Sequence, residues 1–130
     1  MNQSDGKFVV IIDDDASSVE VLGQFLTFLG IQYYAIFDSF DVLGSMEKIQ
    51  DIDAIFLDLE FSRQNGYSVL KTIRRNMKWD RIPIVAYTSH TSQKYQAREA
   101  GFHSFLGKPL DSVACPTQLQ KIINNQAVWD

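Results

Sequence analysis

The chain alternates short apolar runs with segments of helical periodicity, and this alternation restricts the fold more than any other feature. Five apolar runs have the length of strands: FVVII (8–12), QYYAIF (32–37), AIFL (54–57), IPIVAY (82–87) and SFL (104–106). Because the first and third runs lack polar alternation, they are typical of strands buried on both faces. Buried strands that alternate with helices predict a parallel sheet with helices packed on both sides.

The segments between these runs have apolar residues at helical spacing. Val19, Leu22, Leu26 and Leu29 follow the i, i+3, i+7 and i+10 spacing of one helix face. We expect this helix to begin with a capping box at 17–20 and to end at Gly30. Four more helices are predicted: from 38 or 39 toward 49, after the NGY sequence with Val69, Leu70 and Ile73 facing inward, from 92 to 100, and after Pro116.

Right-handed crossovers between these elements predict a doubly wound α/β fold in three layers. At 130 residues the chain has the size of one domain. We expect a core over about 7–125, a short polar N-terminal tail and an irregular C-terminal tail. Trp129 either belongs to a loose tail or covers an apolar surface, and the sequence leaves both open.

The composition is that of a globular domain and argues against several classes of protein. Hydrophobic residues make up 45% and charged residues 22%, and the formal net charge is -4. The acidic balance offers no electrostatic reason to bind nucleic acid or an anionic membrane. Cys115 is the single cysteine, which excludes an internal disulfide. The polar N-terminus does not resemble a signal peptide, so we expect a cytoplasmic protein.

Polar residues follow the strands at their carboxyl ends, where open α/β sheets bind ligands. They are Asp13, Asp14 and Asp15 after the first strand, Asp58 at the end of the third, Thr88 at the end of the fourth and Lys108 after the fifth. Adjacent carboxylates repel one another, but a hard divalent cation such as Mg²⁺ neutralises them and prefers oxygen ligands. A cation, a lysine and a hydroxyl together suit the oxygens of a phosphoryl group, for which Asp58 is the candidate nucleophile.

These residues, in this order, resemble the receiver domain of two-component response regulators over almost the whole chain. In that family an acid pair follows the first strand, the phosphoacceptor ends the third, a Ser or Thr ends the fourth and Lys-Pro follows the fifth. The matching residues are Asp13, Asp14, Asp58, Thr88, Lys108 and Pro109. Gly66 matches the glycine of the loop after the phosphoacceptor, and Phe105 matches an aromatic switch residue. The resemblance implies the flavodoxin-like strand order 2-1-3-4-5.

The resemblance also implies a function. Asp58 would accept a phosphoryl group from a phosphohistidine on a histidine kinase or a histidine phosphotransfer protein. Mg²⁺ or Mn²⁺ would be bound by Asp13, Asp14, Asp58 and the backbone carbonyl of Glu60. Lys108 would pair with the phosphate, while Thr88 and Phe105 would repack the surface formed by the fourth helix, the fifth strand and the fifth helix. A downstream protein would read that surface.

Glu60 and His90 follow the phosphoacceptor and the strand-end threonine by two residues each. In the family these two positions flank the phosphate and tune its lifetime. An ion pair between them would shield an aspartyl phosphate from water and slow its hydrolysis. The alternative is two solvated side chains that never meet.

Two other functions compete with a phosphorylated receiver. A pseudo-receiver would use the same fold as a binding module without phosphorylation. A small Mg²⁺-dependent phosphatase similar to the haloacid dehalogenases would also use an aspartate nucleophile, but it needs an acidic motif after the lysine, where the candidate is Asp111. We expect no enzymatic activity beyond self-phosphorylation and self-dephosphorylation, and a free-standing monomer or weak dimer with no membrane contact.

Four basic residues of the third helix share one face, and they are Lys71, Arg74, Arg75 and Lys78. A charged stripe on a helix is most often a solvated face, and we expect that here, with a docking patch as the alternative.

Overall fold

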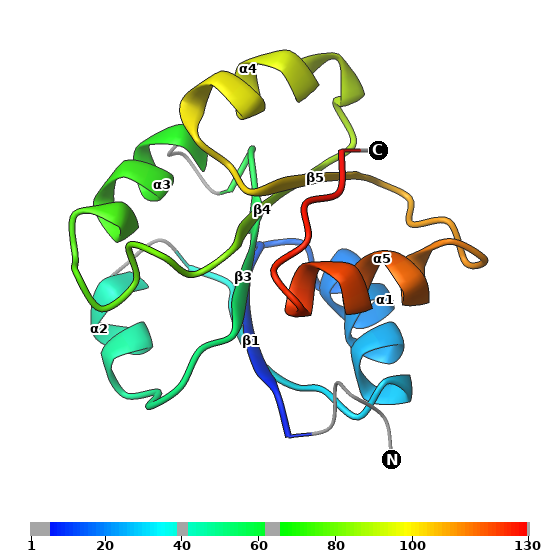
Figure 1. Cartoon of the computed structure of the whole chain (residues 1–130), viewed down its shortest axis with the longest axis horizontal. Coiled ribbons are helices and arrows are strands. Elements are labelled where there is room, and N and C mark those ends of the chain that lie inside the picture. Colours follow the sequence, from blue (N-terminus) through cyan, green and yellow to red (C-terminus); the bar gives the residue numbers. More distant parts are fainter. Residues whose placement is uncertain (1–5, 39–41, 62–65, 130) are drawn as a thin grey trace.

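Five strands alternate with five α-helices in the part of the chain that the structure, a computed structural model, describes: residues 6–38, 42–61 and 66–129 (Figure 1). The strands are β1 (Phe8–Ile12), β2 (Gln32–Ile36), β3 (Ala54–Asp58), β4 (Ile84–Thr88) and β5 (Ser104–Gly107). The helices are α1 (Ala16–Phe28), α2 (Val42–Glu47), α3 (Gly66–Arg74), α4 (Lys94–Ala100) and α5 (Cys115–Ile123), with a 3₁₀ turn η1 (Thr91–Gln93) before α4.

The strands form one parallel sheet in the order β2-β1-β3-β4-β5, which confirms the predicted topology. Helices α1 and α5 cover one face of the sheet, and α2, α3 and α4 cover the other (Figure 1). Ile12 pairs with Leu57 across β1 and β3, so the residues that follow them, Asp13 and Asp58, reach the same edge of the sheet. None of the described helices is long and apolar enough to cross a bilayer.

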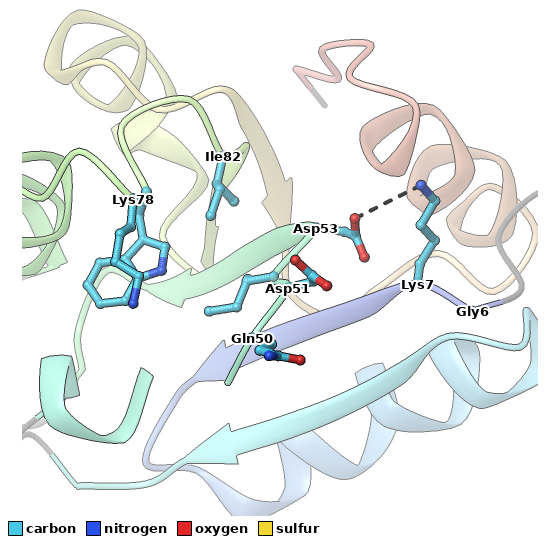
Figure 2. Close-up of a pocket in the computed structure, with 9 residues that line it drawn as sticks. Gly6, Lys7, Gln50, Asp51, Asp53, Lys78 and Ile82 are labelled. Atoms are coloured by element: carbon cyan, nitrogen blue, oxygen red, sulfur yellow. Dashed lines mark ion pairs between the residues drawn. The ribbon is translucent and has the colours of Figure 1, made fainter. Parts of the chain in front are cut away.

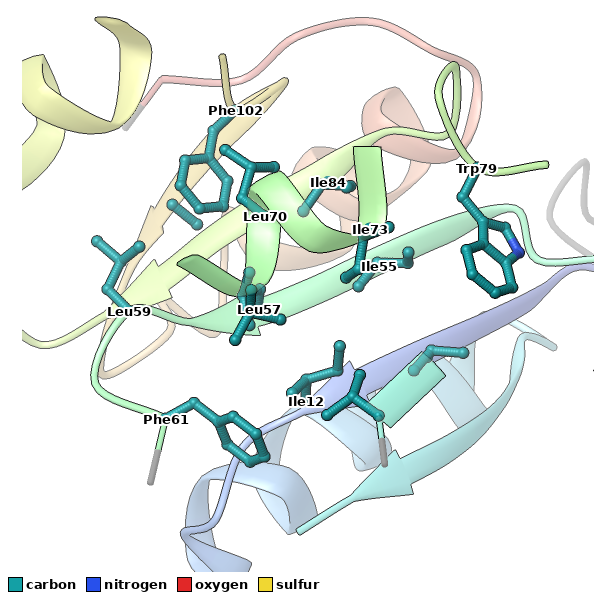
Figure 3. Close-up of a cluster of buried hydrophobic side chains, with 14 of the residues drawn as sticks. Ile12, Ile55, Leu57, Leu59, Phe61, Leu70, Ile73, Trp79, Ile84 and Phe102 are labelled. Carbon is teal, nitrogen blue, oxygen red and sulfur yellow. The ribbon is translucent and has the colours of Figure 1, made fainter. Parts of the chain in front are cut away.

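The core consists of two buried clusters, one on each face of the sheet. Val10 and Ile12 of β1 belong to the cluster under α2, α3 and α4, whereas Val9 and Ile11 belong to the cluster under α1 and α5. This alternation follows from the two-residue period of a strand. Figure 3 shows the first cluster, in which Leu70 and Ile73 of α3 lie over the sheet. Because every residue of β3 and β4 is buried, the polar residues at their ends have a rigid support.

One predicted helix start differs from the structure, and another lies partly outside the described residues. The predicted capping box at 17–20 is wrong, because the N-cap of α1 is Asp15. Its side chain accepts a hydrogen bond from the backbone amide of Ser17 at 3.1 Å and another from the hydroxyl of Ser18 at 2.9 Å. These bonds lower the pKa of the Asp15 carboxyl. The predicted start of the second helix at 38 or 39 touches residues outside the described ranges, and the helix is described from Val42 onward.

Arg74 does not belong to a solvated face, contrary to the expectation for the basic residues of the third helix, and since α3 ends at Arg74, Arg75 and Lys78 lie beyond it and not on its face. Its Nη1 lies 3.1 Å from the carbonyl oxygen of Trp79, 3.2 Å from that of Asp80 and 2.7 Å from that of Ile82. Desolvation lowers the pKa of its guanidinium. The side chain therefore closes the connection between α3 and β4, since it satisfies carbonyl groups that no strand or helix satisfies.

Candidate functional site

Three carboxylates meet at the carboxyl edge of the sheet, as the sequence predicts. Each of Asp13, Asp14 and Asp58 offers an oxygen, and these oxygens all lie within 4.8 Å of one another. Asp13 is completely buried and Asp58 is 6% exposed, while Asp14 is open to solvent. The amide of Asp15 donates a hydrogen bond of 2.9 Å to Asp13 Oδ1, which fixes that carboxylate within the loop. Such a set of hard oxygen donors fits Mg²⁺.

Lys108 brings a positive charge to these acids from the end of β5. Its Nζ lies 2.8 Å from Asp13 Oδ2 and 3.9 Å from Asp58 Oδ1. The backbone amide of Lys108 donates a hydrogen bond of 2.8 Å to the carbonyl of Thr88, and this bond holds the residue at the sheet edge. The ammonium also lies 4.6 Å from the centroid of the Tyr87 ring. Lys108 therefore stands between the two buried carboxylates and above an aromatic face.

Asp58 has an electrostatic environment that disfavours its charge. Burial is the main cause and raises the pKa of this carboxyl to about 6, and the charges of Asp13 and Glu60 act in the same direction. Two contacts oppose the rise: the backbone amide of Glu60 donates a hydrogen bond of 3.1 Å to Asp58 Oδ1, and Lys108 attracts the carboxylate. Asp58 is consequently ionised at neutral pH but poorly solvated, which favours a nucleophile.

Thr88 is completely buried at the end of β4. Its hydroxyl oxygen accepts a hydrogen bond of 3.2 Å from the backbone amide of His90. In the sheet register Asp58 of β3 pairs with Tyr87 of β4, and Thr88 is the residue after Tyr87. The predicted hydroxyl is thus at the same edge as the phosphoacceptor candidate.

Glu60 and His90 contact each other at the mouth of this site. His90 Nε2 lies 3.0 Å from Glu60 Oε2, and about half of each side chain is exposed. Of the two arrangements that the sequence leaves open, the structure shows the contact. Because the pair is solvated, its value to fold stability is small.

Gly66 and Phe105 occupy positions with clear structural requirements. A Cβ atom at Gly66 would lie 2.7 Å from the Cα of Leu59 and 3.0 Å from the carbonyl oxygen of Asp58, so no larger residue fits where α3 starts against the end of β3. The Gly66 amide also donates a hydrogen bond of 2.8 Å to the carbonyl of Leu59. Phe105 is completely buried on β5, beside Ala86 of β4.

Tyr87 is a member of the site that the sequence reasoning missed. Its ring supports Lys108, and burial together with the charge of Asp13 raises the pKa of its phenol, which keeps it neutral. The sequence signal for Tyr87 was its position directly before the hydroxyl residue that ends β4. Its side chain lies on the face of the sheet under α1 and α5, close to the sheet edge. The cavity at this edge has a volume of about 470 Å³, and Asp58, Lys108 and Tyr87 are among its lining residues.

A larger cavity, of about 650 Å³, opens near the amino ends of β1 and β3 (Figure 2). Asp53 is part of its lining, but its carboxylate already accepts a hydrogen bond of 2.8 Å from the amide of Phe8 and lies 3.9 Å from Lys7 Nζ. Lys78, another lining residue, has its Nζ 5.6 Å from the centroid of the Trp79 ring. In this cavity the charge of Asp53 is therefore paired with Lys7, and the Lys78 ammonium lies over an aromatic ring.

Comparison with known proteins identifies the family of this chain. The family model of the response regulator receiver domain matches residues 9–122, and the chain belongs to that family. It is 30% identical to the protein PilG of Pseudomonas aeruginosa over 111 residues, which cover 82% of this chain and 80% of PilG. It is also 27% identical to hybrid signal transduction histidine kinase L of Dictyostelium discoideum over 109 residues, 78% of this chain but 6% of that protein. The family match decides against a haloacid dehalogenase-like phosphatase.

Several curated relatives are much longer than this chain, which spans 16% of the sensor histidine kinase CheAY of Helicobacter pylori and 52% of stress response regulator protein 1 of Meyerozyma guilliermondii. Among solved structures, the receiver domain of sensor histidine kinase PA1611 from Pseudomonas aeruginosa is 26% identical, with a TM-score of 0.79 over 92% of this chain and 98% of that one. That structure has a magnesium ion coordinated in its active-site cleft. The chemotaxis response regulator CheY4 of Vibrio cholerae shares the fold at 21% identity, with a TM-score of 0.78 over 89% of this chain and 98% of that one.

Proposed function

We propose that this receiver domain accepts a phosphoryl group on Asp58 from the phosphohistidine of a histidine kinase or a histidine phosphotransfer protein. The observation that supports the proposal most directly is the environment of Asp58. This buried carboxylate ends the central strand, has two more carboxylates beside it, and lies 3.9 Å from the ammonium of Lys108. The other residues act around that carboxylate.

In the transfer step an oxygen of Asp58 attacks phosphorus. The new O–P bond forms as the P–N bond to the donor imidazole breaks, and the electron pair of that bond stays on the nitrogen, which takes a proton from solvent. The hydrogen bond from the Glu60 amide to Asp58 Oδ1 orients the carboxylate for the attack. Lys108 pairs with an oxygen of the transferred group, and its charge offsets the charge that arrives.

The metal ligands in this proposal are Asp13, Asp14, Asp58 and the backbone carbonyl of Glu60, with Mg²⁺ or Mn²⁺ as the ion. When bound, the cation neutralises the clustered carboxylates and the phosphoryl oxygens. We expect Mg²⁺ to raise the melting temperature because it binds the folded chain, and Asp14→Ala to abolish that rise. A rise of equal size in this variant would contradict the ligand assignment.

Thr88 and Phe105 transmit the modification to the surface of α4, β5 and α5. The hydroxyl of Thr88, whose oxygen accepts a hydrogen bond from the His90 amide, donates its own hydrogen to an oxygen of the phosphoryl group. Phe105 lies on the neighbouring strand β5, and the residue after it pairs with Tyr87. A shift of Thr88, which follows Tyr87, therefore changes the packing of the Phe105 ring. A downstream protein then distinguishes the two states of this surface.

The contact between Glu60 and His90 sets the lifetime of the aspartyl phosphate. Their side chains meet at 3.0 Å over the mouth of the site and therefore obstruct the in-line approach of water. The Glu60 carboxylate also repels hydroxide, although its exposure weakens this effect. Removal of either side chain opens the same path.

The test is incubation of the protein with acetyl phosphate and Mg²⁺, followed by measurement of the intact mass. We expect the mass to increase by one phosphoryl group in the wild type and in Asp51→Asn, an exposed acid at the other end of the sheet. Asp58→Asn should show no increase. An unmodified wild type would favour the pseudo-receiver instead, and a modified Asp58→Asn would refute the assignment of the acceptor.

A further inference from the structure

The chain reverses direction immediately after α5. Asn125 has a φ of 65°, which is the left-handed conformation that asparagine tolerates better than most residues. Its amide donates a hydrogen bond of 2.9 Å to the carbonyl of Ile122, and the amide of Gln126 donates one of 2.7 Å to the carbonyl of Lys121. These two bonds form a Schellman motif. The motif ends α5 and directs residues 126–129 back toward the sheet.

Residues 126–129, which we call the return segment, then pair with the outer edge of β5. The amide of Phe105 donates a hydrogen bond of 2.7 Å to the carbonyl of Val128, and Trp129 forms a parallel bridge with Phe105. The amide of Val128 donates a bond of 2.9 Å to the hydroxyl of Ser104, which is completely buried. Since β5 is the last strand of the sheet, the return segment covers an edge that would otherwise be open (Figure 1).

Val128 and Trp129 of the return segment pack on opposite faces of the sheet. Val128 contacts the cluster under α1 and α5, whereas Trp129 contacts the cluster under α2, α3 and α4. This is the alternation of a strand. The guanidinium of Arg98, on α4, lies 4.5 Å from the centroid of the Trp129 ring. The edge of β5 thus offers a main-chain donor at Phe105, a side-chain acceptor at Ser104, an apolar contact on each face and a cation for an aromatic ring.

We propose that the edge of β5 is a binding site for an extended peptide with an adjacent aliphatic and aromatic residue, and that the return segment is its intramolecular occupant. The groups that bind Val128 and Trp129 recognise a main chain and two side chains, and none of them requires a covalent link to α5. The occupant is short, with one bridge to β5, so a strand of greater length displaces it by making more hydrogen bonds. This inference does not depend on phosphorylation of Asp58.

Tethering explains why the site is occupied within the chain. The return segment follows α5 directly, so its effective concentration at β5 is high, and a free peptide of the same sequence competes poorly. A partner at this edge therefore meets a filled site and binds only by displacing Trp129. The edge is consequently protected from unspecific strand pairing, which open edges promote.

The test uses a fluorescein-labelled peptide with the sequence of residues 124–130 and the full chain in three forms. These are the wild type, the variant Val128→Ser/Trp129→Ser, and the matched control Phe28→Ser/Val113→Ser, which changes two exposed residues elsewhere. Peptide binding to each form is measured by fluorescence anisotropy, and the sizes of the unlabelled wild type and of the Val128→Ser/Trp129→Ser variant are measured as well. We expect the Val128→Ser/Trp129→Ser variant to bind the peptide at least tenfold more tightly than the wild type or the control. A peptide with serine in place of tryptophan should not bind.

Equal affinity for all proteins, or binding to none of them, would overturn the proposal. A dimeric wild type whose Val128→Ser/Trp129→Ser variant is monomeric would overturn it as well, because the segment would then be exchanged between copies. Amide hydrogen exchange gives a measurement that does not need the peptide. We expect Phe105 to exchange faster in the variant than in the wild type, and unchanged protection of this amide would contradict the edge contact.

Discussion

Replacement of Asp58 by asparagine should raise the free energy of unfolding at neutral pH, because it removes a buried charge. Burial raises the pKa of Asp58 from 3.8 to about 6 in the folded protein. Each pKa unit corresponds to about 1.4 kcal/mol, so ionisation of Asp58 costs the fold about 3 kcal/mol above pH 6. For a domain of 130 residues this is a difference of about 10 °C in melting temperature.

The sign of the pH dependence follows from the direction of the shift. The folded-state pKa lies above the unfolded one, so the contribution of Asp58 to the free energy of unfolding is fully present below the unfolded pKa and is lost as the pH rises through about 6. Urea denaturation of the wild type and Asp58→Asn, from about pH 4 to pH 8 without divalent ions, measures this loss as a difference between the two proteins. Subtraction removes the contribution of the other acids, and Asp51→Asn is the control.

We expect the stability difference between Asp58→Asn and the wild type to grow with pH and to reach a plateau above neutrality. Mg²⁺ should narrow it, because a bound cation compensates the charge of the wild-type carboxylate. A difference that is constant across the pH range would refute the argument. So would an asparagine variant that is less stable than the wild type at pH 7.

Three further predictions concern other parts of the molecule. The single variants Glu60→Ala and His90→Ala should each hydrolyse the aspartyl phosphate faster than the wild type, with a double variant that is not additive; equal decay of all four proteins would contradict the lifetime role. Gly66→Ala should cost about 1–3 kcal/mol in urea denaturation, because its methyl group would overlap the end of β3, and an unchanged midpoint would contradict that packing. Arg74→Met should cost about 2–3 kcal/mol through the carbonyl groups that it leaves unpaired, whereas Lys71→Met on the same helix, which is exposed, should cost almost nothing; equal effects would show that these contacts are not stabilising.

The positions of the site residues were predictable because the strand period places them. Once FVVII and AIFL are recognised as neighbouring parallel strands, Asp13 and Asp58 must lie at the same edge, and the register of Ile12 with Leu57 confirms it. The same reasoning applies to Thr88 and Lys108, whose backbones are joined by a hydrogen bond. Apolar periodicity predicted the parallel strands and the family resemblance implied their order, and the two together placed these residues at one edge of the sheet.

The hydrogen-bond partners of individual polar side chains were not predictable from strand and helix periodicity. Asp15 and the serines after it are all good N-cap residues, and the choice of Asp15 depends on where the loop after β1 turns. Arg74 was assigned to a solvated stripe because helical periodicity does not reveal which carbonyl groups of the next loop lie within its reach. The pKa of Asp58 likewise depends on burial, which the residue type does not disclose.

Residues 124–129 show how a short sequence acquires a defined structure from its contacts with the rest of the fold. NNQAVW has no strand period long enough to identify, and a single bridge to β5 is too little to form a strand alone. The left-handed conformation of Asn125 turns the chain toward β5. There the Phe105 amide donates a hydrogen bond and the Ser104 hydroxyl accepts one. Val128 and Trp129 then pack against the two apolar clusters on opposite faces of the sheet. Because Phe105 lies on β5 and Lys108 follows its last residue, the covered edge and the candidate site lie along the same strand.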